Sequence, residues 1–72
     1  MVNVERLRAA MADQDITIEQ AAAAIGVDRA TLYRRLAKNG ERFTLEEVDR
    51  LAKLLNLSRS DMELIFFDRE LA

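Results

Sequence analysis

Residues 17–36 read TIEQAAAAIGVDRATLYRRL, and this stretch determines the fold that we expect. Thr17 and Gln20 have the spacing of a capping box, in which each side chain satisfies a free backbone N–H at a helix start. Gly26 ends the helix, because glycine accepts the left-handed backbone of a helix terminus. The sequence therefore predicts a short helix over 18–25.

A second short helix is expected directly after the glycine. Asp28 is a candidate N-cap for a helix that runs from Arg29 to about Lys38. Leu32 and Leu36 lie four residues apart, so they share the inward face. An isolated helix of fewer than about 12 residues is marginal in water, so both short helices need other helices as support.

Helical periodicity also predicts that support in the rest of the chain. Helices are expected over 4–13, over 45–56 after a second capping box formed by Thr44 and Glu47, and after Ser58 or Ser60. The fourth helix is expected to face inward with Leu45, Val48, Leu51, Ala52 and Leu55. We therefore expect an all-α fold, a compact bundle of five helices, with residues 1–72 as a single domain.

The composition excludes several kinds of function. The chain has 72 residues and contains neither Cys nor His. A thiolate metal site and a Cys nucleophile are thereby excluded, and the usual near-neutral general base is missing. We expect no enzyme activity, no cofactor, no metal, no small-molecule ligand and no membrane insertion. These residues are suited to binding rather than to chemistry.

The charges are unevenly distributed along the chain. The formal net charge is −2, which by itself argues against a nucleic-acid partner. Residues 29–42, however, hold five basic residues and one acidic residue, a net charge of +4. The segments on either side, 1–28 and 43–72, each have a net charge of −3. This pattern predicts a positive pole at the third helix that attracts a phosphate backbone.

Residues 17–32 resemble the helix-turn-helix of phage Cro- and repressor-type regulators, the XRE-like group. The resemblance is carried by the small residue Ala22, the turn residue Gly26 and the apolar Ala21, Ile25, Val27 and Leu32. It implies a lambda-repressor-like fold in which the second and third helices form the helix-turn-helix, over 17–38. Two positions depart from the family pattern. Ile18 replaces a frequent Gln, and Arg35 replaces an apolar residue whose inward place falls to Leu36.

The resemblance also implies which residues bind DNA. The family's base-facing positions in the third helix fall on Arg29, Ala30, Tyr33 and Arg34. Arginine can bind guanine bidentately in the major groove, and alanine can contact a thymine methyl group. Phosphate contacts are expected from Thr17, Ile18, Arg35, Lys38 and Arg42.

The leading prediction is therefore a sequence-specific regulator of transcription that binds double-stranded DNA. It would come from a phage or mobile element, with the third helix in the major groove. A module of this size buries only about 600–1,000 Å² on DNA, which favours a homodimer on a pseudo-palindromic operator. We expect a cytoplasmic protein, associated with the nucleoid of a bacterial host.

Two other interpretations remain open. A small helical protein-interaction module, such as an adaptor or an antitoxin-like neutraliser, would fit the overall acidity and the apolar segment 65–67. It would not explain the +4 charge around the third helix. A Fis-like or recombinase-type DNA-binding end would also fit residues 31–36.

Overall fold

The computed structural model describes residues 2–37 and 43–67, which form five α-helices and no strand. In chain order the helices are α1 (Val4–Asp13), α2 (Ile18–Ile25), α3 (Arg29–Ala37), α4 (Leu45–Leu54) and α5 (Arg59–Phe66). The prediction of an all-α fold with five helices is confirmed for the described part of the chain.

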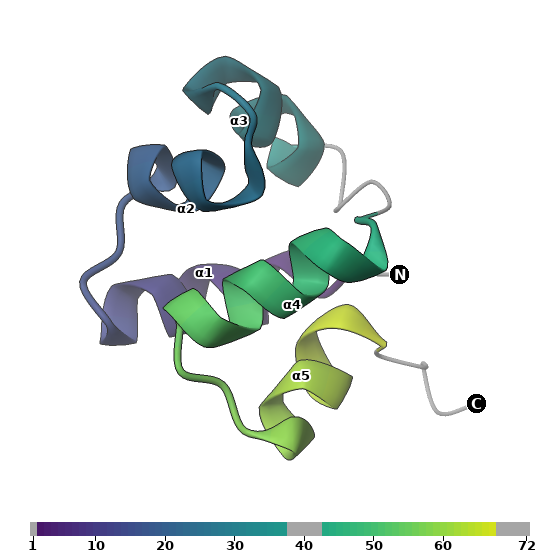
Figure 1. Cartoon of the computed structure of the whole chain (residues 1–72). Helices are drawn as coiled ribbons and strands as arrows, with labels where there is room; N and C mark the ends of the chain where they lie inside the picture. Colours follow the sequence, from purple (N-terminus) through teal and green to yellow (C-terminus); the bar gives the residue numbers. More distant parts are fainter. Residues whose placement is uncertain (1, 38–42, 68–72) are drawn as a thin grey trace.

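The helices are arranged so that α3 lies at one end of the molecule. In Figure 1, α1 and α4 run through the middle, α2 and α3 lie above them, and α5 lies below. The most extensive packing joins α2 to both α4 and α3, and α1 to α5. Thus α2 connects α3 to the rest of the bundle, and α5 lies at the opposite end.

The core is apolar and draws side chains from every helix. Its most completely buried large side chains are Leu7, Leu32, Leu51 and Leu55. No polar or charged residue is buried in the described ranges. Burying one such leucine contributes about 1.5–3 kcal/mol, more than an exposed ion pair does. The packing of α3 against the bundle is therefore stabilised mainly by the buried side chains of Leu32 and Leu36.

Three of the helices end in the same way. Shortly after its last residue, each of α1, α2 and α4 has one residue in the left-handed conformation. These residues are Asp15 (φ 56°), Gly26 (φ 79°) and Asn56 (φ 55°). In each case the next N–H donates to a carbonyl five residues earlier, at 2.8–3.0 Å. This is the Schellman arrangement. The apolar residues that follow are Ile16, Val27 and Leu57, and all three pack on the core.

Two expectations for the fourth helix need correction, and the structure decides between the two starts predicted for the fifth. Leu45 was expected to face inward, but it is the first residue of α4 and is 79% exposed. The fourth helix ends at Leu54, because Asn56 takes up the left-handed conformation. Ser58, not Ser60, caps the fifth helix, since its side chain accepts a hydrogen bond from the Asp61 N–H at 3.0 Å.

Candidate nucleic-acid interface

The turn between α2 and α3 is built from hydrogen bonds at both helix ends. Gly26 has φ 79° and ψ 27°, and its N–H donates to the carbonyl of Ala23. A Cβ at Gly26 would meet nothing within 4 Å, so the backbone conformation and not space demands glycine. Asp28 then caps α3 by accepting a hydrogen bond from the Thr31 N–H at 2.8 Å. The turn thus fixes where α3 begins.

Small residues on α2 allow α3 to approach closely. Ala21 and Ala22 are buried on α2, and the main packing partners of this helix are α3 and α4. On α3 the buried residues are Leu32 and Leu36. The prediction that Leu36 takes the inward place is confirmed. The opposite face of α3 is therefore left to solvent.

The four residues predicted to read bases share this outer face. They are Arg29, Ala30, Tyr33 and Arg34, and all four are exposed. They form two adjacent pairs, and residues of one pair lie three to five positions from those of the other, which places the pairs on neighbouring helical turns. The large aromatic side chain of Tyr33 is 54% exposed, because no helix of the described residues covers it. The structure therefore brings the predicted base-reading residues together on one accessible surface.

Hydrogen bonds link the start of this face to its middle. The Arg34 guanidinium donates to the hydroxyl of Thr31 at 3.5 Å. Hydrogen bonds from the Thr31 hydroxyl and N–H hold the pKa of Asp28 below its ordinary value. Desolvation opposes this shift in pKa, and the positive charge of Arg34 adds to it. The carboxylate of Asp28 is thereby kept ionised at the N-terminus of α3, where a negative charge is favourable.

The adjacent residue Arg35, predicted to contact phosphate, is paired with a carboxylate of the protein. Its guanidinium lies 3.2 Å from a carboxylate oxygen of Glu47, and the two side chains are only 20% and 15% exposed. Its charge is therefore largely engaged within the protein. This geometry favours a structural contact over the predicted contact with phosphate.

The remaining predicted phosphate contacts lie at the start of α2 or outside the described residues. Thr17 accepts a hydrogen bond from the Gln20 N–H at 3.1 Å, and Gln20 accepts one from the Thr17 N–H at 2.8 Å. The predicted capping box is thus confirmed. Ile18 is partly buried against the core. Lys38 and Arg42 lie outside the described residues.

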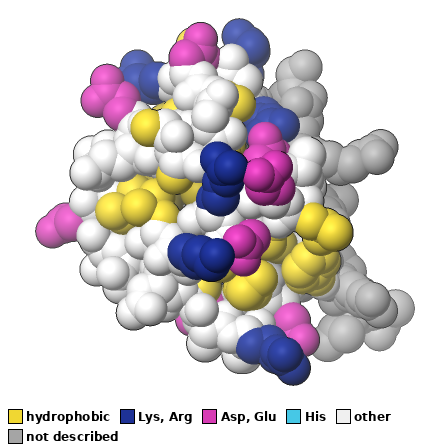
Figure 2. Space-filling model, viewed as in Figure 1, with side chains coloured by type: hydrophobic (Ala, Val, Ile, Leu, Met, Phe, Trp, Pro, Cys, Tyr) yellow, Lys and Arg dark blue, Asp and Glu magenta, His cyan; other side chains and the backbone are white. Residues whose placement is uncertain are grey.

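The surface charges of α3 and α4 differ in kind. Figure 2 shows Lys and Arg side chains at the top, where α3 lies, with acidic side chains beside them, and adjacent blue and magenta side chains over α4. On α4, Arg50 pairs with Glu46 at 2.8 Å, and Lys53 pairs with Asp49 at 3.1 Å. The helix α3 itself contains no acidic residue. Its arginines are therefore the cations not balanced within their own helix.

The part of the chain that the structure describes lacks the features of a metal site and of a membrane span. It contains no group of three His, Cys, Asp or Glu side chains that could hold a metal ion. None of its helices is long and apolar enough to cross a membrane.

Comparison with known proteins assigns the family. A family model described as helix-turn-helix matches residues 7–62, which is most of the chain. The chain belongs to this helix-turn-helix family of XRE and Cro/repressor type, whose members are DNA-binding regulators of transcription and are generally not enzymes. The lambda-repressor-like fold is consistent with the match. Searches of curated proteins and of solved structures gave no match.

Sequence reasoning missed the partners of the interface residues. Glu47 was recognised as part of a capping box, and this role is confirmed. Its second role, as the partner of Arg35, leaves no local signal because the two residues lie 12 positions apart on different helices. The departure from an apolar residue at Arg35 was the signal that something must compensate its charge.

Proposed function

We propose that the protein is a sequence-specific regulator of transcription that inserts α3 into the major groove of double-stranded DNA. The observation that carries this proposal is the division of α3 into two faces. Leu32 and Leu36 are buried, whereas the face with Arg29, Tyr33 and Arg34 is exposed. An α-helix fits the major groove of B-DNA, where each base pair presents a distinct set of donors and acceptors.

The side chains of this face suit different parts of the DNA. Arg29 and Arg34 would bind guanine, each good bidentate contact contributing about 1–3 kcal/mol of discrimination. Ala30 would contact a thymine methyl group, and the exposed ring of Tyr33 would lie against sugar or phosphate. A phosphate would bind at the N-terminus of α2, beside Thr17 and at the backbone N–H of Ile18, since the first N–H groups of a helix point out of its N-terminus. The Thr17 N–H itself already donates to Gln20. Lys38 and Arg42 are proposed as further phosphate contacts.

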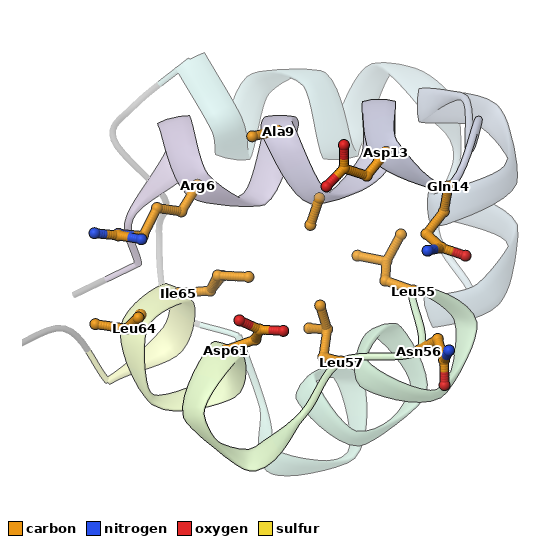
Figure 3. A pocket seen from close by; sticks show the side chains of 11 residues that line it. Arg6, Ala9, Asp13, Gln14, Leu55, Asn56, Leu57, Asp61, Leu64 and Ile65 are labelled. Atoms are coloured by element: carbon orange, nitrogen blue, oxygen red, sulfur yellow. The ribbon is translucent and has the colours of Figure 1, made fainter.

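A second copy of the chain is proposed to complete the DNA-binding unit. The surface of α1 and α5, at the end away from α3, is hollowed by a groove of about 260 Å³. Figure 3 shows Arg6 and Asp13 on its α1 side and Asp61 and Leu64 on its α5 side. A symmetric interface must be self-complementary, and this groove offers both signs of charge around apolar side chains. Two copies would present their α3 helices to half-sites about 34 Å apart.

The biological setting is proposed from the resemblance to phage Cro- and repressor-type regulators. A small chain that occupies an operator as a dimer would act as a repressor or Cro-like regulator of a phage or mobile element. It would work in the cytoplasm of the bacterial host, bound to the nucleoid. DNA is the only partner besides a second copy that this proposal requires.

Titration with salt tests the proposal. The affinity for a labelled duplex, measured by fluorescence anisotropy, should fall steeply as salt rises, because phosphate contacts release counterions. Arg34→Ala should weaken binding to a specific duplex by about 1–3 kcal/mol. Arg50→Ala is the matched control, since Arg50 is an exposed arginine on α4 and not part of the proposed face. An affinity that stays constant between low and moderate salt would refute DNA binding.

The alternative of a protein-interaction module remains a candidate because apolar side chains are exposed near the end of α5. Leu64 is 40% exposed and Phe67 is 48% exposed. Under this alternative, Leu64→Ser would abolish binding to a protein partner while Arg34→Ala would have no effect. Under the DNA-binding proposal, Leu64→Ser weakens dimerisation and leaves α3 intact. Analytical ultracentrifugation together with anisotropy separates the two cases.

A further inference from the structure

Glu47 joins two helices through a single carboxylate oxygen. Its Oε1 accepts a hydrogen bond from the Thr44 N–H at 2.9 Å, which completes the cap of α4. The same atom accepts a hydrogen bond from Arg35 Nη1 at 3.2 Å. Arg35 lies in the last turns of α3, and Glu47 in the first turn of α4. The contact therefore ties the end of α3 to the start of α4.

An aromatic side chain supports the same guanidinium. The guanidinium carbon of Arg35 lies 5.0 Å from the centre of the Phe43 ring, a cation–π distance. Phe43 in turn lies 6.0 Å from the ring of Phe66, at an interplanar angle of 50°. Phe66 is a core residue of α5. The contacts thus run continuously from α3 to the core around α5.

The other ion pairs of the described residues differ from this one. Arg50–Glu46 and Lys53–Asp49 each join residues four apart within α4. The Arg50 and Glu46 side chains are 51% and 75% exposed, so water screens their attraction. Arg35–Glu47 is largely shielded from solvent and connects two helices. It is the pair that can affect the orientation of one helix relative to another.

We propose that Arg35, Glu47 and Phe43 form a clamp that fixes the last turns of α3 in the orientation needed to read DNA. Arg35 is thus a positioning residue, and it acts through its neighbours Tyr33 and Arg34. The argument rests on the proposed function and on the packing of α3, whose main partner is α2. A helix held mainly along one side needs a second attachment to keep its far end from tilting.

The clamp and a phosphate contact predict opposite effects for Glu47→Gln. Glutamine retains the capping hydrogen bond but removes the charge that holds Arg35. If the clamp positions α3, the affinity for a specific duplex falls about tenfold, and the affinity for a shuffled duplex does not fall. If Arg35 instead binds phosphate, Glu47→Gln frees it, and both duplexes bind more tightly.

The probes and the control can be defined closely. The specific duplex is one selected by the wild-type protein from a random library, and the second duplex is a shuffled version of the same length. Glu46→Gln is the matched control, because it removes an equal charge from the neighbouring, exposed position. The clamp is overturned if Glu47→Gln and Glu46→Gln change the ratio of the two affinities equally.

Arg35→Met gives a second and independent measurement. Methionine keeps an unbranched apolar chain over Phe43 and removes the charge. The clamp predicts a lower ratio of specific to shuffled affinity with an unchanged dependence of log K on log salt. Loss of a phosphate contact would reduce that slope by about 0.9 and would overturn the clamp. General loss of folded protein would lower both affinities equally, which would also overturn it.

Failure of the clamp can be distinguished from failure of the proposed function. If the wild-type protein binds no duplex, DNA binding itself is refuted. Amide hydrogen exchange of the free protein then tests the clamp independently of DNA binding. Arg35→Met should speed exchange of the last α3 amides several-fold and leave α2 unchanged. Unchanged exchange in α3 would overturn the clamp.

Discussion

The helices α2 and α3 are neighbours of similar length, eight and nine residues, but they expose very different surfaces. Both are capped by a side chain at the first turn, Thr17 for α2 and Asp28 for α3. The helix α2 has packing partners on two sides, whereas α3 has its main partner on one side. The exposed residues of α3 include Arg29, Tyr33 and Arg34, whereas α2 exposes Glu19, Gln20 and Ala23.

This difference separates folding from binding within one motif. Substitutions that face inward on either helix should lower the stability of the fold. Substitutions on the outer face of α3 should leave stability nearly unchanged, because surface changes away from special features usually stay within about 0.5 kcal/mol. The following variants test this separation, from the largest expected effect to the smallest.

Leu32→Ala should have the largest effect, because Leu32 is almost fully buried and anchors α3. Truncation of a buried leucine costs about 2–5 kcal/mol, depending on how far the cavity collapses. Urea unfolding followed by circular dichroism measures the loss. Tyr33→Ala, the adjacent exposed residue, is the control. Equal losses for the two variants would mean that α3 has no inward face.

Gly26→Ala tests the link between the two helices. Placing a residue that bears a Cβ in the left-handed conformation lowers the free energy of unfolding by about 1–2 kcal/mol. At Gly26 no steric contact adds to that cost, because nothing lies within 4 Å of an added Cβ. Gly26→Asn should lose less, because asparagine tolerates this conformation, as Asn56 does at the end of α4. Thermal unfolding of the three proteins should rank glycine above asparagine and asparagine above alanine. A different ranking would indicate that the turn has changed its backbone.

Thr17→Ala tests the start of the packed helix. Loss of a threonine N-cap typically costs about 1 kcal/mol, since an N–H of the first turn loses its partner. Thr17→Ser should restore the stability because serine retains the hydroxyl. Chemical denaturation gives both values. If serine fails to restore stability, the capping box is not the source of the effect.

Asp28→Ala tests the start of the exposed helix and should have the smallest effect of these variants on stability. The pKa of Asp28 is lowered in the folded protein, so its contribution is fully present above the pKa of the unfolded chain. That contribution is lost as the pH falls through the lower pKa of the folded state. The stability difference between wild type and Asp28→Ala should therefore be constant near neutral pH and shrink in acid. The stability difference between Asp28→Asn, which caps without titrating, and Asp28→Ala should show no such dependence, because neither variant has a carboxyl group at this position.

The sequence predicted the helices better than it predicted their side-chain partners. Local signals such as the capping boxes at Thr17 and Thr44 placed the helix starts correctly. Gly26 was recognised as a helix end, but Asp15 and Asn56 adopt the same conformation without glycine. Their left-handed backbone follows from the burial of the next apolar residue, which only the assembled core requires.

The same limit applies to the candidate site. Positions on the outer face of α3 follow from helical spacing, so Arg29 and Arg34 could be assigned from sequence. The pairing of Arg35 with Glu47 depends on how two helices meet in space. The net charge of residues 29–42 includes Arg35, although Glu47 on α4 balances the charge of this arginine.

The central claim is that the outer face of α3 reads the sequence of duplex DNA. Selection from a random duplex library tests it most directly, with the wild type, the double variant Arg29→Ala/Arg34→Ala, and Arg50→Ala as control. The account predicts that wild type and control enrich one element with two half-sites about 34 Å apart, while the folded double variant enriches none. Enrichment of the same element by the double variant would contradict it.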